Sequence, residues 1–146
     1  MAPLIVMLVV WGIARAIGVA GVWPPADSWS GALRIGLAVM FVFTAVSHVL
    51  PRTRPDLVRM VPAGFPAPAL LVTITGVLEF LGAVGLLVPQ TRTAAALGLI
   101  ALLVAMVPAN VHAARAGLMV AGRRASALVW RLPLQLFWIW ALWWVR

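Results

Sequence analysis

The sequence predicts an all-α membrane protein whose chain crosses the bilayer five times. Of the 146 residues, 64% are hydrophobic and only 10% are charged, whereas soluble domains carry about 25% charged residues. The apolar residues form five runs, each near the length of about 20 residues that a spanning helix needs. The connections between the runs are short, so we expect the helices to be antiparallel neighbours in one bundle.

The five predicted spans cover, in chain order, residues 3–22, 30–50, 66–88, 93–114 and 127–145. The first run lacks the basic start and the shorter apolar core of a secretory signal peptide, so we expect a retained helix. Pro51 ends the second run and Pro89 ends the third. Pro108 predicts a kink near the end of the fourth.

The net charge of +8 comes from arginine alone, because the chain has no lysine. The arginines lie between apolar runs, which is typical of membrane loops and argues against binding to nucleic acid. The chain has no cysteine. This excludes disulfide exchange, thiolate-bound zinc and cysteine-ligated iron–sulfur clusters, and the sequence has no haem signature either.

Arginine is concentrated in two connections on the same predicted side of the membrane, 51–65 and 115–126. They carry Arg52, Arg54, Arg59, Arg115, Arg123 and Arg124. By the positive-inside rule, the N-terminus is then cytoplasmic and the C-terminus outside, as in a bacterial-type plasma membrane. The opposite side gathers Trp23, Trp29, Trp140, Trp143 and Trp144, as an interfacial aromatic belt would.

Glu79 is the only glutamate, and it lies in the middle of the third apolar run. A charge at mid-bilayer costs roughly 2.5–3.5 kcal/mol, so this carboxyl group needs a partner, a proton or a function. Three glycines of the same run, Gly76, Gly82 and Gly85, would let a neighbouring helix approach closely. We expect Arg131 to be the countercharge, because its planar guanidinium group suits a carboxylate.

Other polar residues fall at the cytoplasmic third of neighbouring spans, several of them four residues apart on one helix face. The candidate site residues are Thr44, His48, Thr75, Glu79, Asn110, His112, Arg131 and Gln135. They predict a polar pocket open toward the cytoplasmic leaflet, with Glu79 at its floor. The alternative is that these groups only hold the helices together, and that the two histidines lie at the membrane interface.

Four segments resemble the DoxX-like membrane proteins in order: a histidine just before a proline (His48, Pro51), G-x-x-E-x-x-G-A-x-G-L-L (76–87), an A-N…H-A segment (109–113) and R-x-P-L-Q (131–135). His112 departs from the family pattern by one position. The resemblance covers about residues 31–140. It implies a four-helix membrane domain over 30–146, to which residues 1–22 add an extra helix.

The resemblance implies a redox-associated membrane subunit whose pocket takes a quinone-like or other small ligand. Histidine, asparagine and arginine can hydrogen-bond a quinone oxygen. The alternative is a non-enzymatic scaffold or assembly factor, so no enzymatic activity is assigned. A metal site formed by His48, Glu79 and His112 is a third reading. Expected partners are the lipid bilayer, other membrane or redox subunits and a second copy of the chain.

Overall fold

The computed structural model describes residues 2–120, 122–124 and 128–146. Five helical segments are long and apolar enough to cross a membrane, as the sequence predicts. They are α1 (Ala2–Val19), α2 (Trp29–Ser47), α4 (Pro68–Leu87), the segment Arg92–Arg115 and α7 (Leu128–Val145). The remaining elements are η1 (Pro24–Ala26), α3 (Arg54–Met60), β1 (Met119–Val120) and β2 (Arg123–Arg124).

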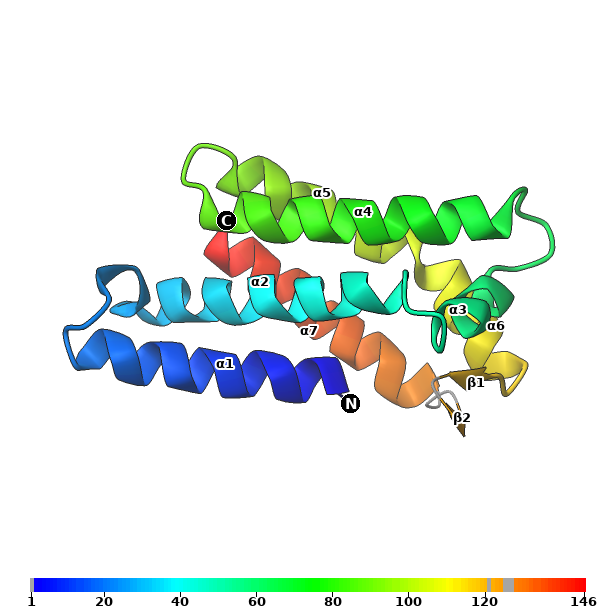
Figure 1. Cartoon of the computed structure of the whole chain (residues 1–146), viewed down its shortest axis with the longest axis horizontal. Coiled ribbons are helices and arrows are strands. Elements are labelled where there is room, and N and C mark those ends of the chain that lie inside the picture. The colour runs from blue at the N-terminus through cyan, green and yellow to red at the C-terminus, as the bar shows by residue number, and fades with distance from the viewer. Residues whose placement is uncertain (1, 121, 125–127) are drawn as a thin grey trace.

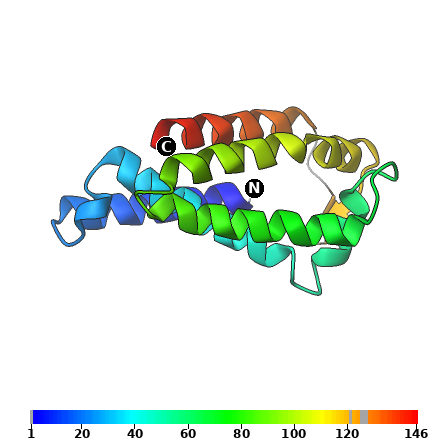
Figure 2. The same ribbon diagram turned by 90° about the horizontal axis from the view of Figure 1, so that it is seen from above.

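Four of the spans form a closed bundle (Figure 1). Helix α2 packs against α4 and α7, and the segment 92–105 packs against the same two helices from the other side. Helix α1 packs along the outside of α2 and extends beyond the ends of α4 and α7 (Figure 2). The arrangement is therefore an antiparallel four-helix bundle with one added helix.

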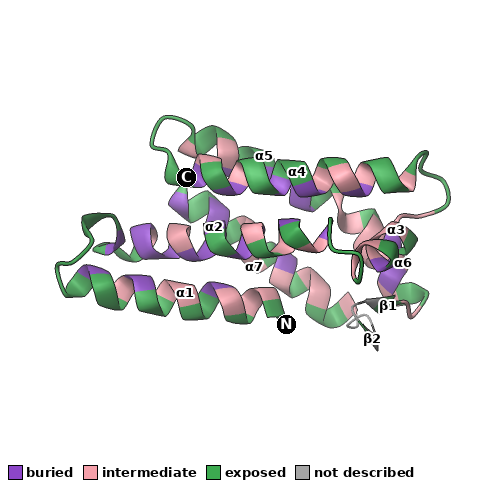
Figure 3. Cartoon of the chain, viewed as in Figure 1, coloured by how far each residue is buried: buried purple, intermediate pink, exposed green. Residues whose placement is uncertain are grey.

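All five spans contribute to one buried apolar cluster. Met7, Phe41, Leu86, Leu99 and Leu142, one from each span, are each at most 2% exposed within it. The outward faces also carry many exposed large apolar side chains. Figure 3 shows exposed residues along α1, α2 and α4. A water-soluble protein rarely exposes apolar surface on this scale, whereas the lipid-facing side of a membrane bundle is expected to do so.

The fourth span is broken near its predicted kink. Helix α5 (Arg92–Ala105) ends before Met106, and α6 (Val107–Arg115) begins with Pro108 in its first turn. Proline has no amide hydrogen to donate to the preceding turn, and its ring clashes with the carbonyl there. The kink expected at Pro108 is confirmed, and it turns α6 away from the axis of α5 (Figure 1).

The two arginine-rich connections contain more regular structure than the sequence predicts. Residues 54–60 form α3, and the two short strands β1 and β2 pair as an antiparallel hairpin. In the first connection, Thr53 precedes Arg54, Pro55 and Asp56. Proline and an acidic residue in the first turn are a helix-start signal. Helix α3 and the β1–β2 hairpin lie at one end of the bundle, and the C-terminus lies at the other (Figure 1).

Candidate functional site

A pocket of about 250 Å³ lies at the arginine-rich end of the bundle. Its walls come from the end of α2, the start of α4 and the junction between α5 and α6, and α3 with the residues after it covers it. The lining is mostly apolar and includes Met60, Phe65, Val72, Met106 and Pro108. Three polar residues, His48, Thr75 and Asn110, also line it.

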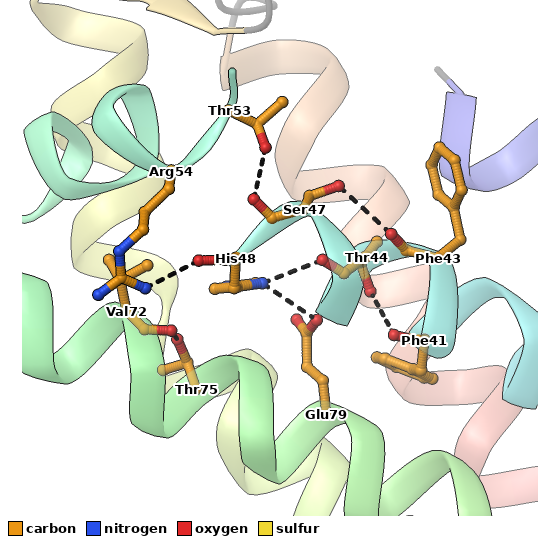
Figure 4. A network of polar contacts seen from close by, with 10 residues as sticks. All are labelled: Phe41, Phe43, Thr44, Ser47, His48, Thr53, Arg54, Val72, Thr75 and Glu79. Carbon is orange, nitrogen blue, oxygen red and sulfur yellow. Dashed lines mark hydrogen bonds and ion pairs between the residues drawn. The ribbon is translucent and has the colours of Figure 1, made fainter. Parts of the chain in front are cut away.

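Arg54 holds the cover of the pocket in place. Its Nη1 donates to the His48 carbonyl at 2.9 Å, and its Nη2 donates to the Ala69 carbonyl at 3.1 Å and to Thr73 Oγ1 at 2.9 Å. One guanidinium group thus joins the end of α2 to the start of α4. Figure 4 shows its bond to the His48 carbonyl. From the sequence, Arg54 is expected only as one of the charges of the 51–65 connection. The signal that could have revealed its role is the T-R-P-D helix start.

His48 connects the pocket to Glu79. The ring lines the pocket, and its Nδ1 lies 3.0 Å from the Thr44 carbonyl oxygen and 3.7 Å from Glu79 Oε2. Figure 4 shows Glu79 reaching from α4 toward this nitrogen. Glu79 is only 4% exposed, and within the described chain its Oε2 has no hydrogen-bond partner. The pair therefore places a buried carboxyl oxygen directly behind a pocket-lining ring.

Glycine at position 76 makes this approach possible. A Cβ built on Gly76 would lie 2.6 Å from His48 Cβ and 2.9 Å from its Cγ. Gly82 and Gly85 are equally close to Leu99 and Ala95 of α5. The expectation that these glycines allow close helix packing is confirmed. Gly76 lies one turn before Glu79, so the G-x-x-E spacing makes room for the His48 ring on the same side of α4 as the Glu79 carboxyl group.

The titration of His48, which follows the last residue of α2, depends on burial and on two neighbours of the ring. Burial lowers the pKa of His48, and the positive charge of Arg54 lowers it further. The hydrogen bond to the Thr44 carbonyl favours the charged ring and acts in the opposite direction. Because burial is the largest of these effects, His48 is neutral at neutral pH.

A second polar network joins the kinked span to α7. Arg131 Nη1 donates to Asn110 Oδ1 at 2.9 Å, and Asn110 Nδ2 donates to Gln135 Oε1 at 3.2 Å. Gln135 Nε2 donates in turn to the Leu103 carbonyl. Asn110 lines the pocket, so this network forms the back of one pocket wall.

The structure divides the predicted polar set in two. Thr44, His48 and Glu79 meet between α2 and α4, whereas Asn110, Arg131 and Gln135 meet between α6 and α7. The expected pairing of Glu79 with Arg131 is wrong. Glu79 Oε2 lies 3.7 Å from His48 Nδ1, and Arg131 hydrogen-bonds Asn110. The two groups lie in separate networks because His48, only one residue past the end of α2, already fills the space beside Glu79.

The predicted floor of the pocket is also wrong. Glu79 is not among the lining residues, because His48 lies between it and the pocket. Thr75, one turn earlier on α4, lines the pocket instead, and its hydroxyl donates to the Val72 carbonyl.

His112 does not join either network. Asn110 and His112 are two residues apart and point to different faces of α6, and only Asn110 lines the pocket. Among the residues that the structure describes, no three His, Asp and Glu side chains gather as a metal site would require. The triad of His48, Glu79 and His112 is therefore not assembled.

Comparison with known proteins gives one match. The family model described as Domain of unknown function (DUF8561) matches residues 37–146, which include α4 to α7 and most of α2. No curated protein and no solved structure matches the chain. The matched region contains the pocket and both polar networks. Because the match covers well over half of the chain, the chain belongs to the family Domain of unknown function (DUF8561).

Proposed function

We propose that this protein is a redox-associated membrane subunit that holds the head group of a quinone-like molecule in the pocket at the arginine-rich end. The observation that carries the proposal is the lining itself. Apolar side chains surround the space, and His48, Thr75 and Asn110 supply a few polar groups. Ligand sites commonly combine an apolar cavity with a small number of polar groups that fix orientation.

The size of the pocket supports a single ring as the occupant. Ligand pockets usually begin at about 300 Å³, and this one has about 250 Å³. It suits a head group better than a complete lipophilic molecule, whose tail would extend along the bundle into lipid. The resemblance to DoxX-like proteins supports the redox association, and the arginine-rich end would face the cytoplasm of a bacterial-type cell.

A ligand titration tests the proposal on the purified protein in detergent. A tail-less benzoquinone at a hundred times its Kd should stabilise the wild type by about 2.7 kcal/mol. His48→Leu should abolish most of the thermal shift, whereas His112→Leu, which changes the histidine outside the pocket, should retain it. No thermal shift in the wild type, or equal shifts in both variants, would contradict the proposal.

A scaffold or assembly role is the second candidate, and one observation favours it. Arg131, Asn110 and Gln135 bond to one another and to the backbone, so this network fixes α6 to α7 without a ligand. Such a role predicts that Gln135→Leu lowers stability and the recovery of partner subunits together. A folded His48→Leu variant that keeps its partners but loses quinone binding would favour the first candidate.

A further inference from the structure

His48 presents its two ring nitrogens to different surroundings. Nδ1 lies 3.0 Å from the Thr44 carbonyl oxygen and faces Glu79 (Figure 4). A carbonyl oxygen can only accept, so Nδ1 carries a hydrogen and donates it. His48 lines the pocket and Glu79 does not. The nitrogen left for a ligand in the pocket is therefore Nε2.

The protonation of Nε2 decides which ligand atom it can bind. In a neutral imidazole whose hydrogen is on Nδ1, the other nitrogen is an acceptor. It becomes a donor only when the ring is charged. Because burial lowers the pKa of His48 and Arg54 adds to this effect, Nε2 is an acceptor at neutral pH. A pocket with such a nitrogen in its wall favours a ligand that brings its own donor.

We infer that the pocket selects a ring with a hydroxyl group, such as the reduced hydroquinone member of a quinone couple, and binds a ring with only carbonyl oxygens by taking up one proton. This inference rests on the proposed function. The proton comes from solvent and bonds to Nε2, and the new N–H donates to the ligand oxygen. No electron moves, and the complex gains one positive charge on His48.

Glu79 is the acidic group that faces Nδ1 of the ring. Its Oε2 lies 3.7 Å from Nδ1 and has no hydrogen-bond donor in the described part of the chain. When it is ionised, a carboxyl group at this distance favours an imidazolium charge in a buried site. The other charged group next to His48 is Arg54, which opposes that charge. Asp56 of α3 is paired with Arg59, and Thr75 and Asn110 are neutral.

The direction of the pH dependence follows from the lowered pKa of His48. As the pH falls, the ring gains its proton, so the affinity for a carbonyl-only ring rises, by up to tenfold per pH unit. A hydroxyl-bearing ring binds the neutral form, and its affinity stays level through neutral pH. The two members of one quinone couple should therefore respond differently to pH at the same site.

The experiment compares tetramethyl-1,4-benzoquinone with its hydroquinone, bound anaerobically to the full chain in detergent micelles, with empty micelles subtracted. At pH 7.5 the hydroquinone should bind roughly fivefold more tightly than the quinone, which corresponds to the net free energy of about one hydrogen bond. Between pH 7.5 and 6.5 the quinone should gain up to tenfold and the hydroquinone should not. Calorimetry in buffers of different ionisation enthalpy should detect uptake of about one proton with the quinone alone.

Three variants separate the roles of the residues. His48→Leu should remove the preference and the pH dependence together, and His112→Leu should keep both. Glu79→Gln should keep the binding of hydroquinone but lose most of the gain of quinone at pH 6.5. The Glu79→Gln comparison and the wild-type pH profile decide the inference even if His48→Leu does not fold.

The possible failures are distinguishable. If neither ring binds the wild type, the proposed function is wrong and the inference is wrong with it. If both rings bind equally well at both pH values, the pocket holds a ligand but His48 does not select it, and only the inference is overturned.

Discussion

At the scale of single residues, the site depends on a close contact between Gly76 and His48. His48 is 8% exposed although it lies one residue beyond α2. Its ring can lie this deep because α4 presents only a hydrogen at Gly76, where a Cβ would come within 2.6 Å of the histidine. The same contact brings Nδ1 to Glu79. One small residue thus fixes the position of a ring that borders both the pocket and a buried carboxyl group.

Gly76→Ala should therefore displace His48 and destabilise the protein. The added methyl group overpacks the contact, and overpacking costs about 1–3 kcal/mol. Thermal unfolding in detergent measures the loss, and quinone binding should weaken with it. Gly98→Ala on α5 is the matched control, since a Cβ there meets nothing within 4 Å. It should be neutral or stabilise the helix by up to about 1 kcal/mol. Equal stability of the two variants would show that His48 is not held by Gly76.

At the scale of elements, short α3 has a larger role than its two turns suggest. Its position is set by Arg54 at its first residue, whose side chain bonds to α2 and α4. Leu57 and Met60 of α3, with Phe65 after it, then cover the pocket. Arg54 therefore fixes the first residue of α3, and the residues that line the pocket follow it along the chain.

Arg54→Ala should loosen this cover. Loss of hydrogen bonds from a charged donor costs about 1.5–3 kcal/mol, so the amides of residues 54–60 should exchange with solvent at least tenfold faster. Arg52→Ala, which removes an exposed arginine two residues away, is the control and should leave exchange unchanged. Hydrogen exchange with mass spectrometry measures both. Unchanged exchange in Arg54→Ala would mean that the apolar contacts alone hold α3.

The break between α5 and α6 is supported from α7. Gln135 is 4% exposed and bonds both to Asn110 beyond the break and to the Leu103 carbonyl before it. In the absence of water, a backbone carbonyl near a proline break needs such a partner. The polar side chain of Gln135 in the fifth span therefore supplies hydrogen bonds on both sides of the kink in the fourth span.

Gln135→Leu should then lower the free energy of unfolding by about 1–2 kcal/mol, because it leaves a carbonyl and an amide without partners. Gln90→Leu is a suitable control, since Gln90 is exposed in the turn between α4 and α5. Unfolding in a denaturing detergent series measures the difference. A Gln135→Leu variant as stable as Gln90→Leu would indicate that another group satisfies the Leu103 carbonyl.

At the scale of the whole molecule, apolar run length and proline positions were sufficient to predict the five spans and the kink. The pairing of polar groups could not be predicted in the same way. Depth along a helix places Arg131 in the cytoplasmic third and Glu79 near mid-bilayer, within reach of a long side chain, but it does not say which helix faces which. The rotation of α4 about its axis is set by Gly76, Gly82 and Gly85 against α2 and α5, and it turns Glu79 toward His48. The role of α3 was missed because seven residues carry too little periodicity.

The distribution of arginine along the chain makes a prediction about the orientation of the molecule. The end with α3, α6 and the β1–β2 hairpin carries six arginines in its connections. The other end has the exposed tryptophans Trp29, Trp140, Trp143 and Trp144. Arginine-rich connections are retained in the cytoplasm, so the pocket should lie on that side of the bilayer.

Cysteine labelling can test this orientation without background, because the natural chain has no cysteine. Gly64→Cys places a thiol beside the pocket cover, where a side chain meets nothing within 4 Å, and Gln90→Cys places one in the exposed turn at the opposite end. In intact cells, a membrane-impermeant maleimide should label Gln90→Cys and leave Gly64→Cys unlabelled until the membrane is permeabilised. The opposite pattern would place the pocket outside the cytoplasm, and a quinone bound there would then exchange protons with the external medium.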